Sequence, residues 1–343
     1  MNLQELLNTI RDNASAEYQS RIPEATRTNM EDIRYAMIDD DNIAIANEFM
    51  STLLNKVVKS VVHSKMFTNP LKGLKKGNKP LGDTVEEIYT NFLKGEVYDD
   101  TGANLLKRNL PDTKTVYHRM NYKQKYKVTV SRETLSKAFA SYESLESYIN
   151  NIVNSLYNSA ELDEFLNMKE LIASAFKKNA IKIVEVADPL TSEANGKEFV
   201  KSVKTVSGLM VFPSSEHNSY LTAQAKDKQP IVTFSRKNEQ ILILDTPTDT
   251  SVSVDVLASL FNMSVAEFND TKKIVIDTFP KVDGYSIRGV LIDEAFFQIF
   301  DDLFTVASFN NGEGLYTNYI LHVWKTLAYS ILVNAVAFGV PTE

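Results

Sequence analysis

The residue types that most often carry chemistry are few in this chain, and their spacing fits none of the common catalytic or metal-binding motifs. Among 343 residues there is no cysteine, and the four histidines are His63, His118, His217 and His322. No two histidines stand four residues apart, so the helical spacing of a zinc-protease site is absent. Without thiols the chain has no disulfide framework, no thiolate metal site and no cysteine nucleophile. We therefore expect no cofactor, no metal and no catalytic residue.

Fragments of catalytic motifs occur without the residues that would complete them. Asp245-Thr246-Pro247 has proline where an aspartic protease has glycine, and no second copy exists, so we interpret it as the exit of a strand into a loop. Gly312-Glu313-Gly314 lacks the third glycine of a dinucleotide-binding loop and predicts a turn. His322 and Trp324 stand in an apolar stretch, where a lone histidine is more often a hydrogen-bonded core residue than a catalyst.

Composition and charge indicate a globular protein whose copies contact one another. Hydrophobic residues make up 43% of the chain and charged residues 24%, with a net charge of −7. From Lys65 to Lys127, however, basic residues are almost twice as numerous as acidic ones. An acidic body with one basic segment predicts complementary contacts between copies, although the lysines could instead serve to keep a long loop soluble. A dedicated nucleic-acid binder would be basic overall.

Two N-terminal segments and two connectors precede the most regular part of the chain. Residues 1–40 are polar and predict an irregular arm with one short helix over 3–10. Asp41 is a candidate N-cap for a helix over 43–65, because apolar residues follow at helical spacing. Glycine and proline then mark connectors over 66–83 and 94–113, on either side of a predicted strand over 84–92. The most apolar run, 331–340, is too short to span a membrane.

Strict alternation of residue types over 115–131 predicts one long two-sided ribbon of about 50 Å. An isolated hairpin is marginally stable in water, so this ribbon needs a surface to lie on, and we expect another copy of the chain to supply it. One face would bury apolar residues there while the basic residues of the other meet acidic groups. The expected contact residues are Val116, Arg119, Met120, Tyr122, Lys123, Lys125, Tyr126 and Lys127.

The remaining pattern is that of an α+β protein with one protruding ribbon. A broad apolar stripe without proline or glycine predicts one long helix over 141–176. Further strands are expected over 181–187, 231–234, 241–244, 273–279, 287–292, 315–329 and 334–338. Further helices are expected over 197–209, over 254–261, and from Asp293 through Phe296, Phe297, Ile299 and Phe300.

This order of parts resembles the major capsid proteins of tailed bacteriophages that have the Hong Kong 97-type fold. The C-terminal half is similar, more specifically, to head proteins of small phages of Gram-positive bacteria. The segments that carry this resemblance are 211–214, 255–263, 290–293, 314–325 and 334–338. They are markers of a fold and include no active-site motif.

The resemblance implies a division of the chain into five parts. These are an N-terminal arm and helix (1–65), an extended loop called the E-loop with its connector (66–131), a peripheral (P) domain with a spine helix (132–180), an axial (A) domain (181–285), and C-terminal strands that return to the P domain (286–343). Such subunits form pentamers and hexamers that build an icosahedral or prolate head around double-stranded DNA.

The resemblance also implies partners and a location. We expect a virion protein that assembles in the host cytoplasm with a separate scaffolding protein, a portal and possible decoration proteins, lies close to packaged DNA without reading its sequence, and contacts no membrane. Some relatives cross-link a lysine to an asparagine of a neighbour, but no aligned set of residues supports that chemistry here. Two alternatives stay open: a shell protein of an encapsulin-type nanocompartment, and a soluble hydrolase that uses His322.

Overall fold

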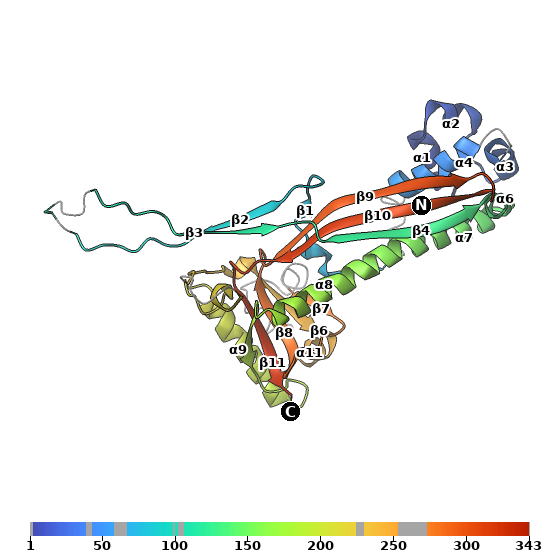
Figure 1. Cartoon of the computed structure of the whole chain (residues 1–343). Helices are drawn as coiled ribbons and strands as arrows, with labels where there is room; N and C mark the ends of the chain where they lie inside the picture. Colours follow the sequence, from blue (N-terminus) through green and yellow to red (C-terminus); the bar gives the residue numbers. More distant parts are fainter. Residues whose placement is uncertain are drawn as a thin grey trace. The chain divides into compact units, whose positions relative to one another are not determined.

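The computed structural model describes residues 3–38, 43–57, 67–98, 100–101, 106–223, 230–252 and 273–342 (Figure 1). It is a mixed α+β chain, as predicted, and it divides into two compact units. The first consists of Met1–Asn69, Tyr122–Glu164 and Asp301–Lys325, and the second of Pro70–Asn121, Phe165–Phe300 and Thr326–Glu343. The predicted cap at Asp41 and the predicted helix over 254–261 lie outside the described residues. No helix in the described part is long and apolar enough to cross a bilayer.

The N-terminal residues are helical and packed, which corrects the prediction of an irregular arm. They form α1 (Leu3–Asn13), α2 (Ala16–Arg21) and α3 (Met30–Ile38), followed by α4 (Ile43–Thr52) and a π-helical turn, Leu53–Val57. The apolar residues of α1 recur at helical spacing and are buried, and α1 contacts α4. The short helix predicted over 3–10 is confirmed as α1, whereas α2 and α3 bury only one and three residues, which is too few to give a clear helical pattern.

The long helix predicted over 141–176 is present as α7 (Tyr142–Val153), a π-helical turn (Asn154–Asn158) and α8 (Ser159–Lys177). It starts where the Ser141 hydroxyl accepts a hydrogen bond from the Ser144 amide at 3.1 Å, which satisfies a free N–H of the first turn. Its predicted apolar stripe is buried at Leu145 and Ile149, whereas Leu166, which also belongs to the stripe, is 49% exposed.

One sheet has four strands in the order β1 (Gly77–Asn78), β9 (Phe297–Asn311), β10 (Tyr316–Tyr329) and β4 (Tyr122–Ser131). The helix predicted from Asp293 is therefore wrong, because Phe297, Ile299 and Phe300 lie at the start of the long strand β9, and Phe296 immediately precedes it. A short run of consecutive apolar residues fits a buried strand as well as a helix, and here strand pairing decided. The turn predicted over 312–314 is confirmed: the Asn311 side-chain oxygen accepts hydrogen bonds from the Glu313 and Gly314 amides, both at 3.0 Å.

A second sheet has five strands in the order β5 (Lys182–Glu185), β11 (Ala335–Pro341), β8 (Tyr285–Asp293), β6 (Gln240–Asp245) and β7 (Lys273–Ile276). Helix α9 (Glu193–Leu209) packs on it, and Phe199 and Val203 join Leu291 and Phe338 in one buried cluster. These elements confirm five predicted strands and the helix predicted over 197–209. The strand predicted over 231–234 makes a single bridge, from Thr233 to Ser214.

The predicted ribbon over 115–131 is two strands in different sheets, so that prediction is wrong. Strand β3 (Thr113–His118) pairs with β2 (Val85–Thr90), whereas β4 pairs with β10. The interruption follows from Asn121, whose amide group donates to the Leu327 carbonyl at 2.8 Å and accepts from the Leu327 N–H at 2.9 Å. Those two bonds replace the pairing that would have continued the strand.

Short helices complete the described chain. At the end of β6, the Asp245 carboxylate accepts a hydrogen bond from the Thr248 amide at 3.1 Å and caps α11. The segment Asp245-Thr246-Pro247 therefore leads from a strand into a helix and not, as predicted, into a loop. The bounds of the short helices are Pro70–Leu74, α6 Arg132–Ala138, α10 Tyr220–Ala223, Lys237–Glu239 and α11 Thr246–Ser251.

The buried carboxyl of Asp293, at the end of β8, gives a pH-dependent prediction. Burial raises its pKa above the usual value and the nearby carboxylates of Glu239 and Glu294 add to the increase, although the Ala295 N–H donates to it at 2.8 Å. Folded chains thus hold this proton more tightly than unfolded chains. The contribution of the group favours the folded state at low pH and is lost as the pH rises through the raised pKa.

We therefore expect Asp293→Asn to make the free energy of unfolding fall less steeply as the pH rises. Asparagine keeps an acceptor for the Ala295 N–H but cannot ionise. Urea denaturation at several pH values from about 4 to 7 measures the effect. If the variant and the native chain differed by a constant amount over this range, the raised pKa would not contribute.

Candidate interaction surface

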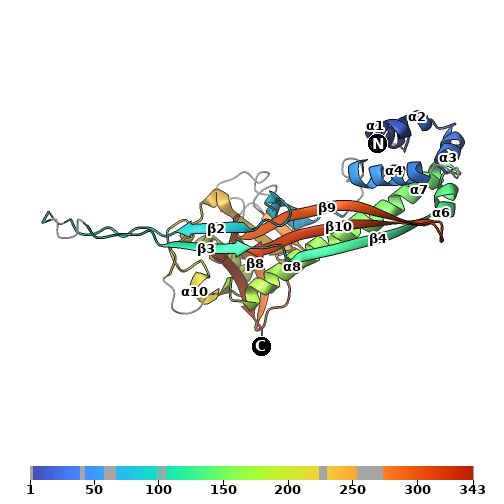
Figure 2. The same cartoon turned by 45° about the horizontal axis from the view of Figure 1, so that its top comes forward.

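The hairpin of β2 and β3 carries the surface of greatest functional interest. Its strands are antiparallel, with Val85 opposite His118 and Thr90 opposite Thr113, and they run side by side to a loop over 91–112 (Figure 2). Residues alternate between half-buried and exposed along both strands. One face therefore lies against its own unit, while the other, which includes Ile88 and Tyr117, stays open.

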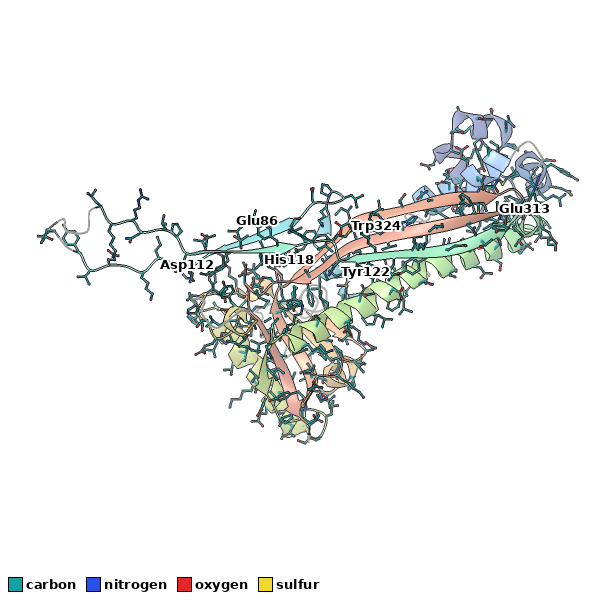
Figure 3. The ribbon with its side chains drawn as sticks, in the orientation of Figure 1. Glu86, Asp112, His118, Tyr122, Glu313 and Trp324 are labelled. Atoms are coloured by element: carbon teal, nitrogen blue, oxygen red, sulfur yellow. The ribbon has the colours of Figure 1, made fainter. Side chains whose placement is uncertain are left out.

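Side chains of the inner face fix the hairpin to the second unit. The Glu87 carboxylate lies 3.0 Å from Nε2 of the buried His118, and its other oxygen accepts a hydrogen bond from the Ser330 hydroxyl. The Tyr89 hydroxyl donates to the Val232 carbonyl, and burial raises the pKa of this phenol, so that it remains a neutral donor. The labels of Glu86 and His118 in Figure 3 mark the two strands.

The last anchor of the hairpin is Asn91. Its amide group donates to the Pro230 carbonyl at 2.9 Å and accepts from the Val232 N–H at 3.0 Å, and its own N–H donates to the Asp112 carbonyl at 2.9 Å. The ring of Phe92 then stacks on Phe234, with centroids 6.4 Å apart. The base of the loop is therefore held in place by its own unit.

Beyond this anchor the loop exposes large apolar side chains to water. In Figure 3 its two limbs extend past Asp112 with side chains spread to either side. An ion pair of 2.9 Å between Lys107 and Glu96 connects the limbs, and the hydrogen bond from Lys107 lowers the pKa of Glu96. The apolar side chains are between 72% and 95% exposed: Leu93, Val97, Tyr98, Leu106 and Leu110. So much exposed apolar surface on one segment is typical of a protein contact.

The structure separates the eight predicted contact residues into three groups, of which the first belongs to the hairpin. Val116 is half-buried on its inner face, Arg119 is exposed, and Met120 is half-buried in the interruption between β3 and β4. Their contact with a second copy stays a prediction.

Tyr122 and Tyr126 form the second group and point into their own unit. Tyr122 is 8% exposed, its hydroxyl lies 3.2 Å from that of Tyr126, and Tyr126 donates to the Asp163 carboxylate at 2.7 Å. Burial raises the pKa of both phenols, so they remain neutral donors. Both hydroxyls are therefore hydrogen-bonded within their own unit, and the contact of these tyrosines with a second copy stays a prediction.

The third group, Lys123, Lys125 and Lys127, is exposed on the outer side of β4, and we call it the lysine row. The lysines stand opposite Trp324, His322 and Ile320 of β10, respectively. Alternate residues of a strand are about 6.7 Å apart, so three positive charges follow one another along this edge of the sheet. Nζ of Lys123 lies 4.7 Å from the centroid of the Trp324 ring, within the range of a cation–π contact.

One further residue, His322, bears on function. It is half-buried opposite Lys125, so the prediction that it is a buried core residue is wrong. Within the described ranges, no three His, Cys, Asp or Glu side chains are grouped to hold a metal ion. The apolar loop residues are not among the predicted contact residues, because the connector predicted over 94–113 is rich in glycine, proline and charged residues. The signal was present, since Val97, Tyr98, Leu106 and Leu110 interrupt that polar stretch.

Comparisons with known proteins agree on one family. The family model described as Phi29-like phage major capsid protein matches residues 7–339. The major capsid protein of Bacillus phage PZA is 32% identical over 339 residues, which cover 97% of this chain and 72% of that protein. That of Bacillus phage GA-1 is 36% identical over 297 residues, covering 86% of this chain and 61% of that protein. Among solved structures, the capsid of Staphylococcus phage Andhra is similar in fold, with a TM-score of 0.65 at 13% identity, over 82% of this chain and 87% of that chain.

Proposed function

This chain belongs to the Phi29-like phage major capsid proteins and forms the shell of a phage head, and from this premise we propose how its copies meet. It is a structural protein of the virion and assembles into homo-oligomeric arrays. We infer that the arrays contain pentamers and hexamers, and that the head holds double-stranded DNA and is built with a scaffolding protein, a portal and possible decoration proteins.

We propose that the fold is of the Hong Kong 97 type. Three observations support this assignment. The continuous helix of α7 and α8 matches a spine helix, the hairpin over 85–118 matches an E-loop, and α9 with strands β5, β6 and β7 matches an A domain. In this proposal the P domain covers 132–180 with the strands of 286–343, the A domain covers 181–285, and an arm precedes them over 1–65.

The proposed contact between copies is made by the hairpin loop over 91–112. The observation that carries it is the exposure of five large apolar side chains beyond the anchor at Asn91. Complete burial of one such side chain contributes about 1.5–3 kcal/mol, so burial of several on a neighbour favours association while each contact stays weak enough to reverse during assembly. Shells that closed normally without residues 95–111 would contradict this contact.

The lysine row supplies the proposed electrostatic part of the interface. The net charge of the chain is −7, so copies carry acidic surface for three exposed lysines to meet. One exposed ion pair contributes less than about 1 kcal/mol and is screened by salt. The row is therefore expected to guide and align copies, whereas the apolar loop holds them together.

Reversing the lysine row tests this electrostatic contact. We expect the triple variant Lys123→Glu, Lys125→Glu, Lys127→Glu to yield few closed shells under conditions in which native chains form shells with five-fold and six-fold rings. Negative-stain electron microscopy of purified chains measures the yield. The control reverses Lys197, Lys201 and Lys204 on α9, which are also exposed and change the net charge equally. Equal yields of closed shells from both variants would show that the position of the reversed lysines does not matter, and would overturn the proposed contact of the lysine row.

A further inference from the structure

The hairpin of β2 and β3 is attached to its own unit through two short stretches of backbone. We call them the anchor segments: residues 230–235 and 330–335. The Asn91 side chain donates to the Pro230 carbonyl at 2.9 Å and accepts from the Val232 N–H at 3.0 Å. The Ser330 hydroxyl donates to the Glu87 carboxylate. A change that moves either anchor segment therefore changes how the hairpin is held.

Buried hydrogen bonds join the two anchor segments to one another. The Asn334 side-chain amide donates to the Ser235 hydroxyl at 3.1 Å, and its oxygen accepts from the Thr233 hydroxyl at 2.5 Å. The Asn218 side chain donates to the Thr233 hydroxyl in turn, at 3.1 Å. All four side chains are at most 3% exposed. A buried polar network with its partners in place is rigid, so the two segments are expected to move together.

The network includes Asp293, at the end of β8, and this residue bonds to both anchor segments. Its carboxyl accepts a hydrogen bond from the Ser235 hydroxyl of the first segment, and also from the Ala295 N–H at 2.8 Å. Its own N–H donates to the Asn334 carbonyl of the second segment at 3.0 Å. The residue is only 8% exposed. Asp293 is therefore the ionisable group through which both attachments of the hairpin are connected.

The surroundings of this carboxyl oppose its ionisation. Burial raises the pKa of Asp293, and the carboxylates of Glu239 and Glu294 add to the increase. Two nearby cations bond to other groups: the Lys76 ammonium donates to the Glu294 carbonyl at 2.7 Å, and Arg236 pairs with Glu239 at 3.6 Å. Residues 330–335 include no titratable side chain. The remaining titratable side chains on the segments packed around the carboxyl are Glu216, His217, Tyr220 and Lys237.

We propose that Asp293 is a positioning residue for the hairpin: its protonated carboxyl holds the anchor segments, and the hairpin with them, in place, and its ionisation lets them separate. A buried carboxylate that is repelled by Glu239 and Glu294 gains hydration when the turn opens, and the open turn no longer holds Ser235. The closed form thus binds the proton more tightly than the open form. Closure is favoured at low pH and is lost as the pH rises through the raised pKa.

The position of the hairpin before assembly would therefore depend on pH. The use of this dependence in assembly rests on the proposed contact of the hairpin loop, whereas the release itself is a property of one chain.

Amide hydrogen exchange in unassembled, full-length chains tests this release, because the Val232 N–H bonds directly to Asn91 of the hairpin. After correction for the intrinsic exchange rate, protection of this amide should fall as the pH rises from about 5 to 8, by up to about tenfold per pH unit. Protection should also be lower than that of the central strands β8 and β11 throughout. Equal protection would mean that only global unfolding frees the hairpin, and would overturn the proposal.

Variants assign the pH dependence to one group. Asp293→Asn should remove it, because asparagine keeps acceptors for Ser235 and Ala295 but cannot ionise. Glu294→Lys, at an exposed position, should lower the pKa of Asp293, so that the fall in protection is smaller and ends at a lower pH. The control Glu198→Lys, exposed on α9, changes the net charge equally and should keep the native profile.

A native pH profile in Asp293→Asn would overturn the proposal. Should that variant not fold, a native profile in Glu294→Lys, or the same altered profile in Glu198→Lys, would overturn it instead. These measurements need no shells, so they separate this inference from the proposed contact of the loop. Chains that close into shells without residues 95–111 would contradict that contact and leave the exchange of Val232 as expected here.

Discussion

Chains in which a Gly-Ser turn replaces residues 95–111 are expected to fold but not to close into shells. The replacement keeps strands β2 and β3 and the hydrogen bond between Asn91 and Asp112, so the base of the hairpin remains anchored to its own unit. It removes Val97, Tyr98, Leu106 and Leu110, which have few contacts within the chain. Thermal denaturation should therefore resemble that of the native chain, whereas sedimentation and electron microscopy should show small species in place of shells.

A second variant separates the length of the loop from its chemistry. It keeps every residue of the backbone but replaces the five exposed apolar side chains with serine. If burial of these side chains drives the contact, this variant should fail as completely as the shortened chain. Shell formation by the serine variant together with failure of the shortened chain would mean that the loop acts through its backbone or its length.

Removal of the buried lysine at 325 is expected to cause the largest loss of stability. Lys325 is 4% exposed, and its ammonium group donates to the carboxylate of Glu164, which is 3% exposed, and lies 3.2 Å from the Asp301 carboxylate. Lys325→Ala leaves the Glu164 carboxylate in the interior without this cation. Breaking a buried ion pair in this way costs about 3–5 kcal/mol of the free energy of unfolding.

Urea denaturation followed by fluorescence measures this loss, because the sole tryptophan, Trp324, precedes Lys325 in β10. Lys325→Met combined with Glu164→Leu should recover most of the stability, since apolar residues of similar volume can replace a buried pair. Lys197→Ala is the control: its 2.7 Å ion pair is with Glu193, the two side chains are 77% and 85% exposed, and its loss should cost far less of the free energy of unfolding. Equal losses at Lys325 and Lys197 would contradict the role of burial.

The sequence alone determined those elements whose pattern admits one interpretation. The helix of α7 and α8 was predictable because its apolar stripe continues for many turns without proline or glycine. Strands β6, β8 and β11 were predictable because each contains a short run of apolar residues, which is typical of a buried strand. The segments near the C-terminus also indicated the capsid family, which the comparisons confirmed.

Tertiary structure decided the elements whose pattern fits two arrangements. The phenylalanines at 296, 297 and 300 are compatible with a helix, but strand pairing in the four-stranded sheet places Phe297 and Phe300 in β9, directly after Phe296. Alternation over 115–131 was real on both sides of Asn121, yet it could not show that this residue would bond to Leu327 and divide the ribbon between two sheets.

The interaction surface was also predictable only in part. Alternation correctly placed Lys123, Lys125 and Lys127 on one face and Tyr122 and Tyr126 on the other. Which face is covered depends on what packs against it, and here Asp163 and the interior of the same unit cover the tyrosines. Periodicity is a local property that residue order determines, whereas burial depends on segments distant in the chain, and only the folded structure brings those segments together.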